Sequence, residues 1–165
     1  MNKIKILFLL AVISLGLSVT AVTPTEVKNA AGAENKQVQP TRTYINAIPI
    51  DMVARPNYYL NKYVKVKATF DKFSTLGLDY KPAMRSSEDY ISFLIQRDDV
   101  RDHNIPLSEM KIFMKRTEAE KYIDLSSGDK IEFSGRVFST ALGDVWMDVD
   151  NFSVLSSKSK SQTKQ

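Results

Sequence analysis

The sequence predicts a mainly β fold in which five strands close into a small Greek-key barrel. The first observation is the strict alternation of apolar and polar side chains along residues 63–70, which is the period of a half-buried strand. The second is a hairpin in which two alternating segments, 127–138 and 144–155, are joined by a Gly-Asp turn. The third is Gly135, because a glycine inside a strand predicts a bulge or a sharp bend. A bent strand that returns through a hairpin favours a closed barrel.

Two further segments complete the set of strands. Residues 90–97 and 110–115 also alternate, and long loops at 73–88 and 98–108 separate them from their neighbours. The apolar face of the five segments predicts the core: Val64, Val66, Ala68, Phe70, Ile91, Phe93, Ile95, Ile112, Met114, Ile131, Phe133, Val145, Met147 and Val149.

Two short helices are predicted beside the strands. Residues 49–55 form the first, at the N-terminal side of the barrel, and Pro56 is expected to end it. Residues 117–125 form the second, between the third and fourth strands. Thr117 is the expected N-cap, with Glu120 three residues further on.

The chain divides into four regions by composition. Residues 1–21 combine a basic start, an apolar run and small residues before Ala21, which predicts a secretory signal peptide. A retained membrane anchor is the alternative, although the run is shorter than the roughly 20 residues of a span. Residues 22–43 are predicted to be a disordered spacer, 44–155 the folded domain and 156–165 a disordered basic tail. The expected product is exported, periplasmic or secreted, without a membrane span after cleavage.

The charge distribution argues against a strongly basic domain. The chain has 23 Lys and Arg residues against 19 Asp and Glu residues, a net charge of +4. Residues 44–155 hold 15 basic and 17 acidic residues, which gives that segment a net charge of −2. A basic domain would have indicated nucleic acid. The chain has no cysteine, which excludes disulfides, cysteine metal sites and thiol chemistry.

The order of three strands, a helix and a closing hairpin resembles the OB-fold, and the resemblance spans about residues 48–155. It is most similar to the nucleic-acid-binding OB domains of exported bacterial proteins, the tRNA-anti-like group. The segments that carry it are YLNKYVKVKA at 59–68, GDKIEFSGRV at 128–137 and VWMDV at 145–149. The chain departs from that group at Asn61 and Ala68, where the group has glycine.

The resemblance implies a binding surface on the second and third strands and the loops beside them. The candidate ligand-binding residues are Lys65, Lys67, Ser92, Gln96, Lys111, Phe113, Lys115 and Trp146. Lysines interleaved with aromatic rings suit single-stranded nucleic acid, because ammonium groups meet phosphates and rings stack on bases. The alternative is a solvated strand face. Trp146, on the polar side of the alternation, is expected to point away from the core or to pack near Tyr58 or Tyr59.

Signals for catalysis and metal binding are weak. The acidic run Asp98, Asp99 and Asp102 lacks the spacing of a calcium loop, and His103 has no partner histidine. No motif of a serine hydrolase, a zinc protease or a P-loop is present. We therefore expect no cofactor, no metal and no enzymatic activity.

These patterns lead to three functional hypotheses. The first is an exported, monomeric, non-enzymatic module that recognises a protein, an oligosaccharide or an oligonucleotide on the face of strands two and three. The second is an envelope protein that binds single-stranded nucleic acid or another polyanion through Lys65, Lys67, Lys111 and Lys115. The third is a metal-dependent hydrolase.

Overall fold

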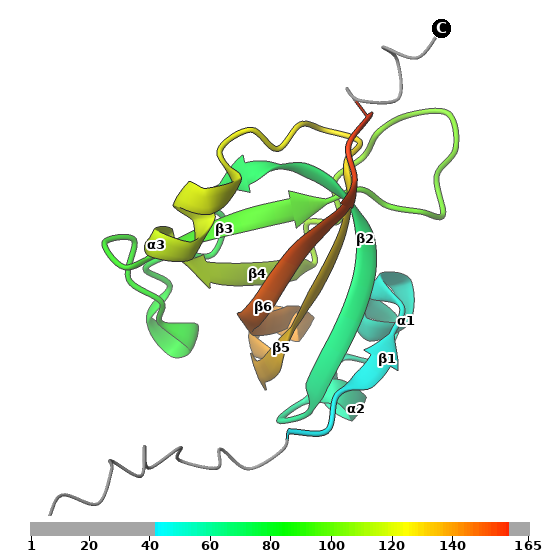
Figure 1. Ribbon diagram of the computed structural model, residues 1–165. Helices are drawn as coiled ribbons and strands as arrows, with labels where there is room; N and C mark the ends of the chain where they lie inside the picture. Colours follow the sequence, from blue (N-terminus) through cyan, green and yellow to red (C-terminus); the bar gives the residue numbers. More distant parts are fainter. Residues whose placement is uncertain (1–41, 159–165) are drawn as a thin grey trace, which may run out of the picture. The chain divides into compact units, whose positions relative to one another are not determined.

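The computed structural model describes residues 42–158 of the chain (Figure 1). The predicted signal peptide, the predicted spacer up to residue 41 and the predicted tail from residue 159 lie outside the described residues. The strands are β1 Ile45–Ala47, β2 Tyr63–Ser74, β3 Tyr90–Ile95, β4 Met110–Lys115, β5 Lys130–Ser139 and β6 Val145–Ser156. The helices are α1 Pro49–Ala54, α2 Pro56–Tyr59 and α3 Arg116–Ala119, with 3-10 turns η1 Lys81–Ala83, η2 Glu120–Tyr122 and η3 Ala141–Gly143.

Five of the strands close into a barrel. The strand order is β1-β2-β3-β4-β6-β5, and β2 also pairs with β5, which closes the five strands from β2 to β6 and leaves β1 attached to β2 outside the ring. The pairing of β4 with β6 is parallel, whereas β2–β3, β3–β4, β5–β6 and β2–β5 are antiparallel. Between β4 and β5 lie α3 and η2, at one end of the barrel (Figure 1). The barrel is an OB-fold, as predicted.

The core follows the alternation seen in the sequence. Val64, Val66, Phe93, Ile112 and Ile131 are fully buried and belong to one apolar cluster inside the barrel. The residues between them on each strand point outward, which places Lys65 and Lys67 on the outer surface of β2. The period of each strand therefore determines which side chains lie outside the barrel core.

Gly135 lies at a bulge, as predicted. The register of the β5–β6 pairing shifts between Ser134 and Gly135. A Cβ atom on Gly135 would lie 1.8 Å from the carbonyl oxygen of Asp148, so only glycine allows the two backbones to approach this closely. A bulge bends the strand that contains it. The strand β5 pairs with β2 along one edge and with β6 along the other.

The helical predictions were correct in place and wrong in detail. Pro56 begins α2 instead of only ending α1, because proline at the first helical position loses no hydrogen bond. Thr117 is not the N-cap of α3; Lys115 holds that position, without a side-chain cap. The helix predicted for 117–125 is one turn of α-helix followed by η2, and it starts where the Arg116 N–H donates to the carbonyl of Asp89.

Two backbone features were not predicted. The short strand β1 pairs in parallel with β2, with Asn46 opposite Lys65 (Figure 1). Asn61, at a position where the resembled group has glycine, has a φ of 65°, and its N–H donates to the carbonyl of Val137 at 2.7 Å. Asparagine tolerates this left-handed conformation better than most residues, which explains how the turn before β2 forms without glycine.

Asp129 holds the turn that leads into β5. Its carboxylate is buried and accepts hydrogen bonds from the backbone N–H groups of Ser126 at 3.0 Å and Lys158 at 2.8 Å. Burial opposes ionisation, but these hydrogen bonds outweigh it, and the pKa of Asp129 is lowered. A carboxyl group with a lower pKa in the folded chain stabilises the fold above its unfolded pKa of about 3.9 and loses that effect as the pH falls through the folded value.

We therefore expect Asp129→Asn to lower the free energy of unfolding by about 1–2 kcal/mol at neutral pH. The difference from the wild type should shrink at acid pH, as the pH falls from about 3.9 through the lower folded pKa and the wild-type carboxylate is also protonated. Urea denaturation at both pH values measures this effect. Asp124→Asn, an exposed carboxylate in the same connection, is the control. An equal loss at both pH values would show that the charge of Asp129 is not the source.

Candidate binding groove

The predicted binding face on β3 and β4 is covered. Phe113 is 0% exposed and Trp146 is 1% exposed, and both pack in a second apolar cluster outside the barrel core. The ring of Tyr80, from the loop between β2 and β3, stacks on Trp146 at a centroid distance of 5.2 Å. The expectation that Phe113 and Trp146 are exposed is wrong. Their side chains do point out of the barrel, but the loop covers them, and Trp146 packs with Tyr80 rather than near Tyr58 or Tyr59.

Two of the four other candidate residues, Ser92 and Lys111, lie opposite Phe113 and Trp146 in the strand pairings and share their covered face. The side chain of Lys111 is only 11% exposed, pairs with Asp144 at 2.9 Å and donates to the carbonyl of Ser108. Ser92 is buried, and Gln96 donates to the hydroxyl of Ser127 at 3.0 Å. Lys115 is exposed at the last position of β4. The face predicted from strands two and three is therefore not an open site in this structure.

Lys65 and Lys67 are the candidates that the structure places together on an open surface. Their side chains are 44% and 72% exposed, and both reach toward Glu132 on β5. The Nζ–carboxylate distances are 3.6 Å and 3.9 Å, which are ion-pair distances but too long for hydrogen bonds. Two ammonium groups therefore share one carboxylate, and one positive charge stays uncompensated.

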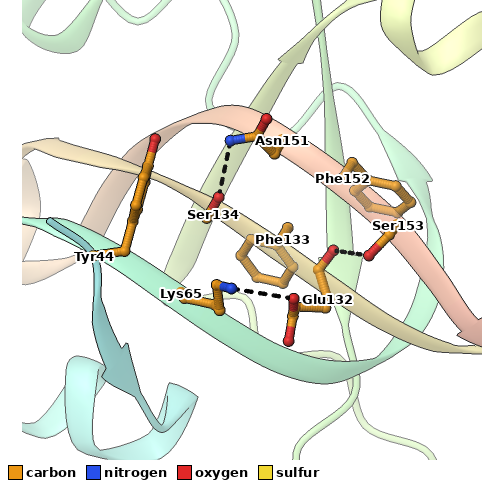
Figure 2. Close-up of a pocket in the computed structure, with 8 residues that line it drawn as sticks. All are labelled: Tyr44, Lys65, Glu132, Phe133, Ser134, Asn151, Phe152 and Ser153. Atoms are coloured by element: carbon orange, nitrogen blue, oxygen red, sulfur yellow. Dashed lines mark hydrogen bonds and ion pairs between the residues drawn. The ribbon is translucent and has the colours of Figure 1, made fainter. Parts of the chain in front are cut away.

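A groove runs beside these lysines on the outer surface of β5 (Figure 2). It has a volume of about 210 Å³. We call it the groove; its lining residues are Tyr44, Lys65, Glu132, Phe133, Ser134, Asn151, Phe152 and Ser153. Figure 2 shows polar side chains along it: the Asn151 amide donates to the Ser134 hydroxyl at 3.2 Å, and the Ser153 hydroxyl donates to the Glu132 carbonyl at 3.4 Å.

Tyr44 lines the groove, and a second aromatic ring and a cation lie next to it. The rings of Tyr44 and Tyr63 meet edge to face at a centroid distance of 5.6 Å, and the guanidinium of Arg42 lies over Tyr63 at 5.1 Å. Arg42 and the hydroxyl of Tyr44 both donate to Asp150, at 3.0 Å and 3.1 Å. The contact with Tyr44 and the charge of Asp150 raise the pKa of Arg42, so this cation stays charged at any physiological pH.

The outer surface around the groove is more positive than the domain as a whole. Five cations lie there. One is Arg42, and the other four are at outward positions of β2 and β5: Lys65, Lys67, Lys130 and Arg136. Glu132 and Asp150 are the carboxylates that pair with Lys65, Lys67 and Arg42 there. The carboxylate of Asp98 also lines the surface beside Lys67, so five cations and three carboxylates give a net charge of +2, whereas residues 42–155 as a whole hold 16 basic and 17 acidic residues and carry −1. Positive charge is thus concentrated on one flank of the barrel.

A second hollow lies across β2 from the groove. It has a volume of about 460 Å³ and is lined by Asn46, Ala47, Ile48, Pro49, Lys67 and Asp98. Because Asn46 is opposite Lys65 in the β1–β2 pairing, the two lysines form a ridge with a hollow on each side. A chain-like ligand could cross this ridge and fill both hollows.

Sequence reasoning found the two lysines and missed most of their neighbours. The alternation of β2 placed Tyr63 beside Lys65 and Lys67, but it could not show that Glu132 pairs with them. That pairing depends on β2 lying next to β5, a contact between residues about 65 positions apart in a closed barrel. The contribution of Tyr44 was missed because residue 44 lies at the predicted domain boundary.

Residues 42–158 contain no group of three His, Cys, Asp or Glu side chains arranged to hold a metal ion. None of the helices in the same part of the chain has the length and hydropathy needed to cross a membrane.

Comparisons with known proteins add little to this geometry. No family model matches the chain, and a search of curated proteins finds no match. Among solved structures, the chain is similar to an OBody bound to hen egg-white lysozyme, with 14% identity and a TM-score of 0.43 over 72% of this chain and 99% of that chain.

Two natural proteins are similar at the same level. Asparaginyl-tRNA synthetase from Pyrococcus horikoshii has 15% identity and a TM-score of 0.40 over 61% of this chain and 20% of its own. The mitochondrial single-stranded DNA-binding protein of S. cerevisiae has 10% identity and a TM-score of 0.40 over 59% of this chain and 96% of its own. The chain thus spans only a fifth of the synthetase.

Proposed function

We propose that the protein is a non-enzymatic binding module that holds a single-stranded, negatively charged oligomer, such as single-stranded nucleic acid, along the groove. The observation that carries the proposal is the ridge of Lys65 and Lys67, two exposed ammonium groups that share one carboxylate at distances too long for hydrogen bonds. Such lysines can turn from Glu132 to a phosphate at little cost, because exposed ion pairs contribute little to stability.

The neighbouring side chains suit the other parts of such a ligand. Tyr44 offers a ring on which a base can stack, and Asn151 and Ser153 offer amide and hydroxyl groups for sugar or base edges. The net charge of +2 on this flank attracts a polyanion over a distance of about 10 Å. The proposed setting is outside the cytoplasm, as the signal-peptide pattern of residues 1–21 predicts.

The test is fluorescence anisotropy of a labelled oligothymidylate of about 12 residues, a length within the range that OB-folds cover. We expect binding that weakens as salt rises. Replacing Lys65 and Lys67 by alanine should weaken binding about tenfold and reduce the slope of log affinity against log salt by roughly 1.4, since each phosphate contact to a single strand contributes about 0.7. Lys115→Ala, an exposed lysine outside the groove, is the matched control.

A second ligand separates charge from base recognition. Dextran sulfate carries negative charge without bases, so equal competition by dextran sulfate and by unlabelled oligothymidylate would assign the groove to polyanions in general. Preference for the oligothymidylate would assign it to nucleic acid. Binding that is insensitive to salt, or unchanged in the double lysine variant, would reject the proposed function.

A further inference from the structure

Two parts of the chain that are distant in sequence meet at one end of the barrel. They are α2 with the turn before β2, and the end of β5 with the η3 turn that follows it (Figure 1). The N–H of Val137 donates to the carbonyl of Lys62 at 3.0 Å. The hydroxyl of Thr140 donates to the side-chain oxygen of Asn57 at 2.9 Å. These hydrogen bonds hold both parts in one surface.

Leu142 is exposed at the tip of η3 in a backbone conformation that suits glycine better than leucine. Its side chain is 73% exposed, and its φ and ψ are 62° and 13°. A bulky residue in this left-handed region costs conformational free energy. Leu142 belongs to neither apolar cluster of residues 42–158, so packing within the domain does not offset this cost. A strained, exposed apolar residue points to a partner that buries it.

Tyr58 presents a second exposed ring on the other part of this surface. It lies on α2 and is 53% exposed. The Nζ of Lys62 lies 3.3 Å from the centre of the ring, and the guanidinium of Arg55 lies 5.3 Å from it. Tyrosine is enriched at membrane–water interfaces, because its ring is apolar and its hydroxyl is polar. Here such a ring is flanked by two cations.

The charge of this end of the barrel is positive. Residues 55–62 and 136–143 contain no Asp or Glu, and their three cations are Arg55, Lys62 and Arg136. Asp51 pairs with Arg55 at 2.6 Å, so three cations and one carboxylate give a net charge of +2. Exposed apolar side chains among cations match an anionic bilayer, in which acyl chains lie directly beneath phosphates. We call this surface the end patch; it consists of Arg55, Tyr58, Lys62, Arg136 and Leu142.

We propose that the end patch binds the surface of a membrane that contains anionic phospholipids. Leu142 enters the boundary of the acyl chains, and the ring of Tyr58 lies at the level of the headgroups. Lys62 and Arg136 meet the lipid phosphates. No residue of the end patch lines the groove, so this inference does not depend on the proposed function.

A fluorescent label at position 142 tests the contact directly. The chain has no cysteine, so Leu142→Cys can carry a single environment-sensitive nitrobenzoxadiazole group. We expect its emission to rise and shift to shorter wavelength with vesicles of equal parts phosphatidylglycerol and phosphatidylcholine. Pure phosphatidylcholine vesicles should leave it unchanged. In the labelled protein, Lys62→Gln should weaken vesicle affinity about fivefold, which is the effect of one lysine at an anionic surface.

Matched controls lie at the opposite end of β5. Ile123 is 76% exposed and precedes β5, whereas Leu142 follows it, so the same label on Ile123→Cys should not respond to vesicles. Lys115→Gln removes an exposed lysine beside α3 and should leave vesicle affinity unchanged. Far-UV circular dichroism confirms that each variant is folded.

The groove is scored separately. Lys65→Ala with Lys67→Ala should keep the vesicle response of the label at position 142, whatever it does to oligothymidylate binding. The proposal is overturned if that label ignores anionic vesicles, if the label at position 123 responds equally, or if the double lysine variant abolishes the response. A label at position 142 that responds to oligothymidylate and not to vesicles would assign the end patch to nucleic acid, and would also overturn the proposal.

Discussion

Replacing Gly135 with alanine is expected to destroy the stable barrel. The added Cβ would lie 1.8 Å from the carbonyl oxygen of Asp148 and 2.9 Å from the Cα of Val149. Both neighbours are backbone atoms of β6, so no side-chain rotation can relieve the overlap. Either the bulge opens or β6 moves away from β5, and both changes break strand pairing on which barrel closure depends.

We expect a loss of about 4 kcal/mol or more, which is a large part of the stability of a small domain. The measurement is urea denaturation followed by circular dichroism, with the soluble yield as a second readout. Gly143→Ala is the matched control, because a Cβ there meets nothing within 4 Å and only the positive φ of 80° opposes it. That control should lose about 1 kcal/mol. A Gly135→Ala protein as stable as the control would show that β5 and β6 are further apart than described.

Replacing Trp146 with alanine should have the next largest effect. Trp146 is 1% exposed, stacks between Tyr80 and Phe113, and donates from its indole N–H to the carbonyl of Ala141 at 2.7 Å. The alanine variant loses the ring contacts and leaves a cavity beneath residues 75–89, the loop between β2 and β3, which we call the cover loop. Large-to-small replacements of this kind cost about 3–5 kcal/mol.

The measurement is again the free energy of unfolding. Trp146→Phe keeps a ring and should cost clearly less than Trp146→Ala. Leu142→Ala is the surface control, since Leu142 is 73% exposed at the tip of the same hairpin and should cost less than about 0.5 kcal/mol. If Trp146→Ala lowers the free energy of unfolding by no more than Leu142→Ala does, the packing of Trp146 beneath the cover loop contributes little to the stability of the protein.

The sequence was a good guide to the strands because each strand has one face in the barrel core. Val64 and Val66 alternate with Lys65 and Lys67, and a one-residue error would have put the lysines inside. The bulge at Gly135 was also predictable from local sequence, because a glycine inside a strand often marks a bulge or a sharp bend. The details of the helices were harder, because α3 starts at a tertiary contact with Asp89 and not at a side-chain cap.

The candidate site was less predictable than the fold. Alternation shows that Phe113 and Trp146 point out of the barrel, but not whether another segment covers them. The residues that cover them belong to a loop, residues 75–89, which has no period from which packing could be predicted. The groove depends on Glu132 and Asn151, which reach Lys65 only through the β2–β5 and β5–β6 pairings.

By itself, the sequence determined the class of fold, the strand that carries Lys65 and Lys67, and the position of the bend that allows closure. These are local properties, set by side-chain period and by the space that glycine leaves. Only the tertiary structure decided which outward face is open. Barrel closure brought β5 beside β2 and formed the positive groove, while the cover loop buried the aromatic face, because both outcomes depend on contacts between residues distant in the chain.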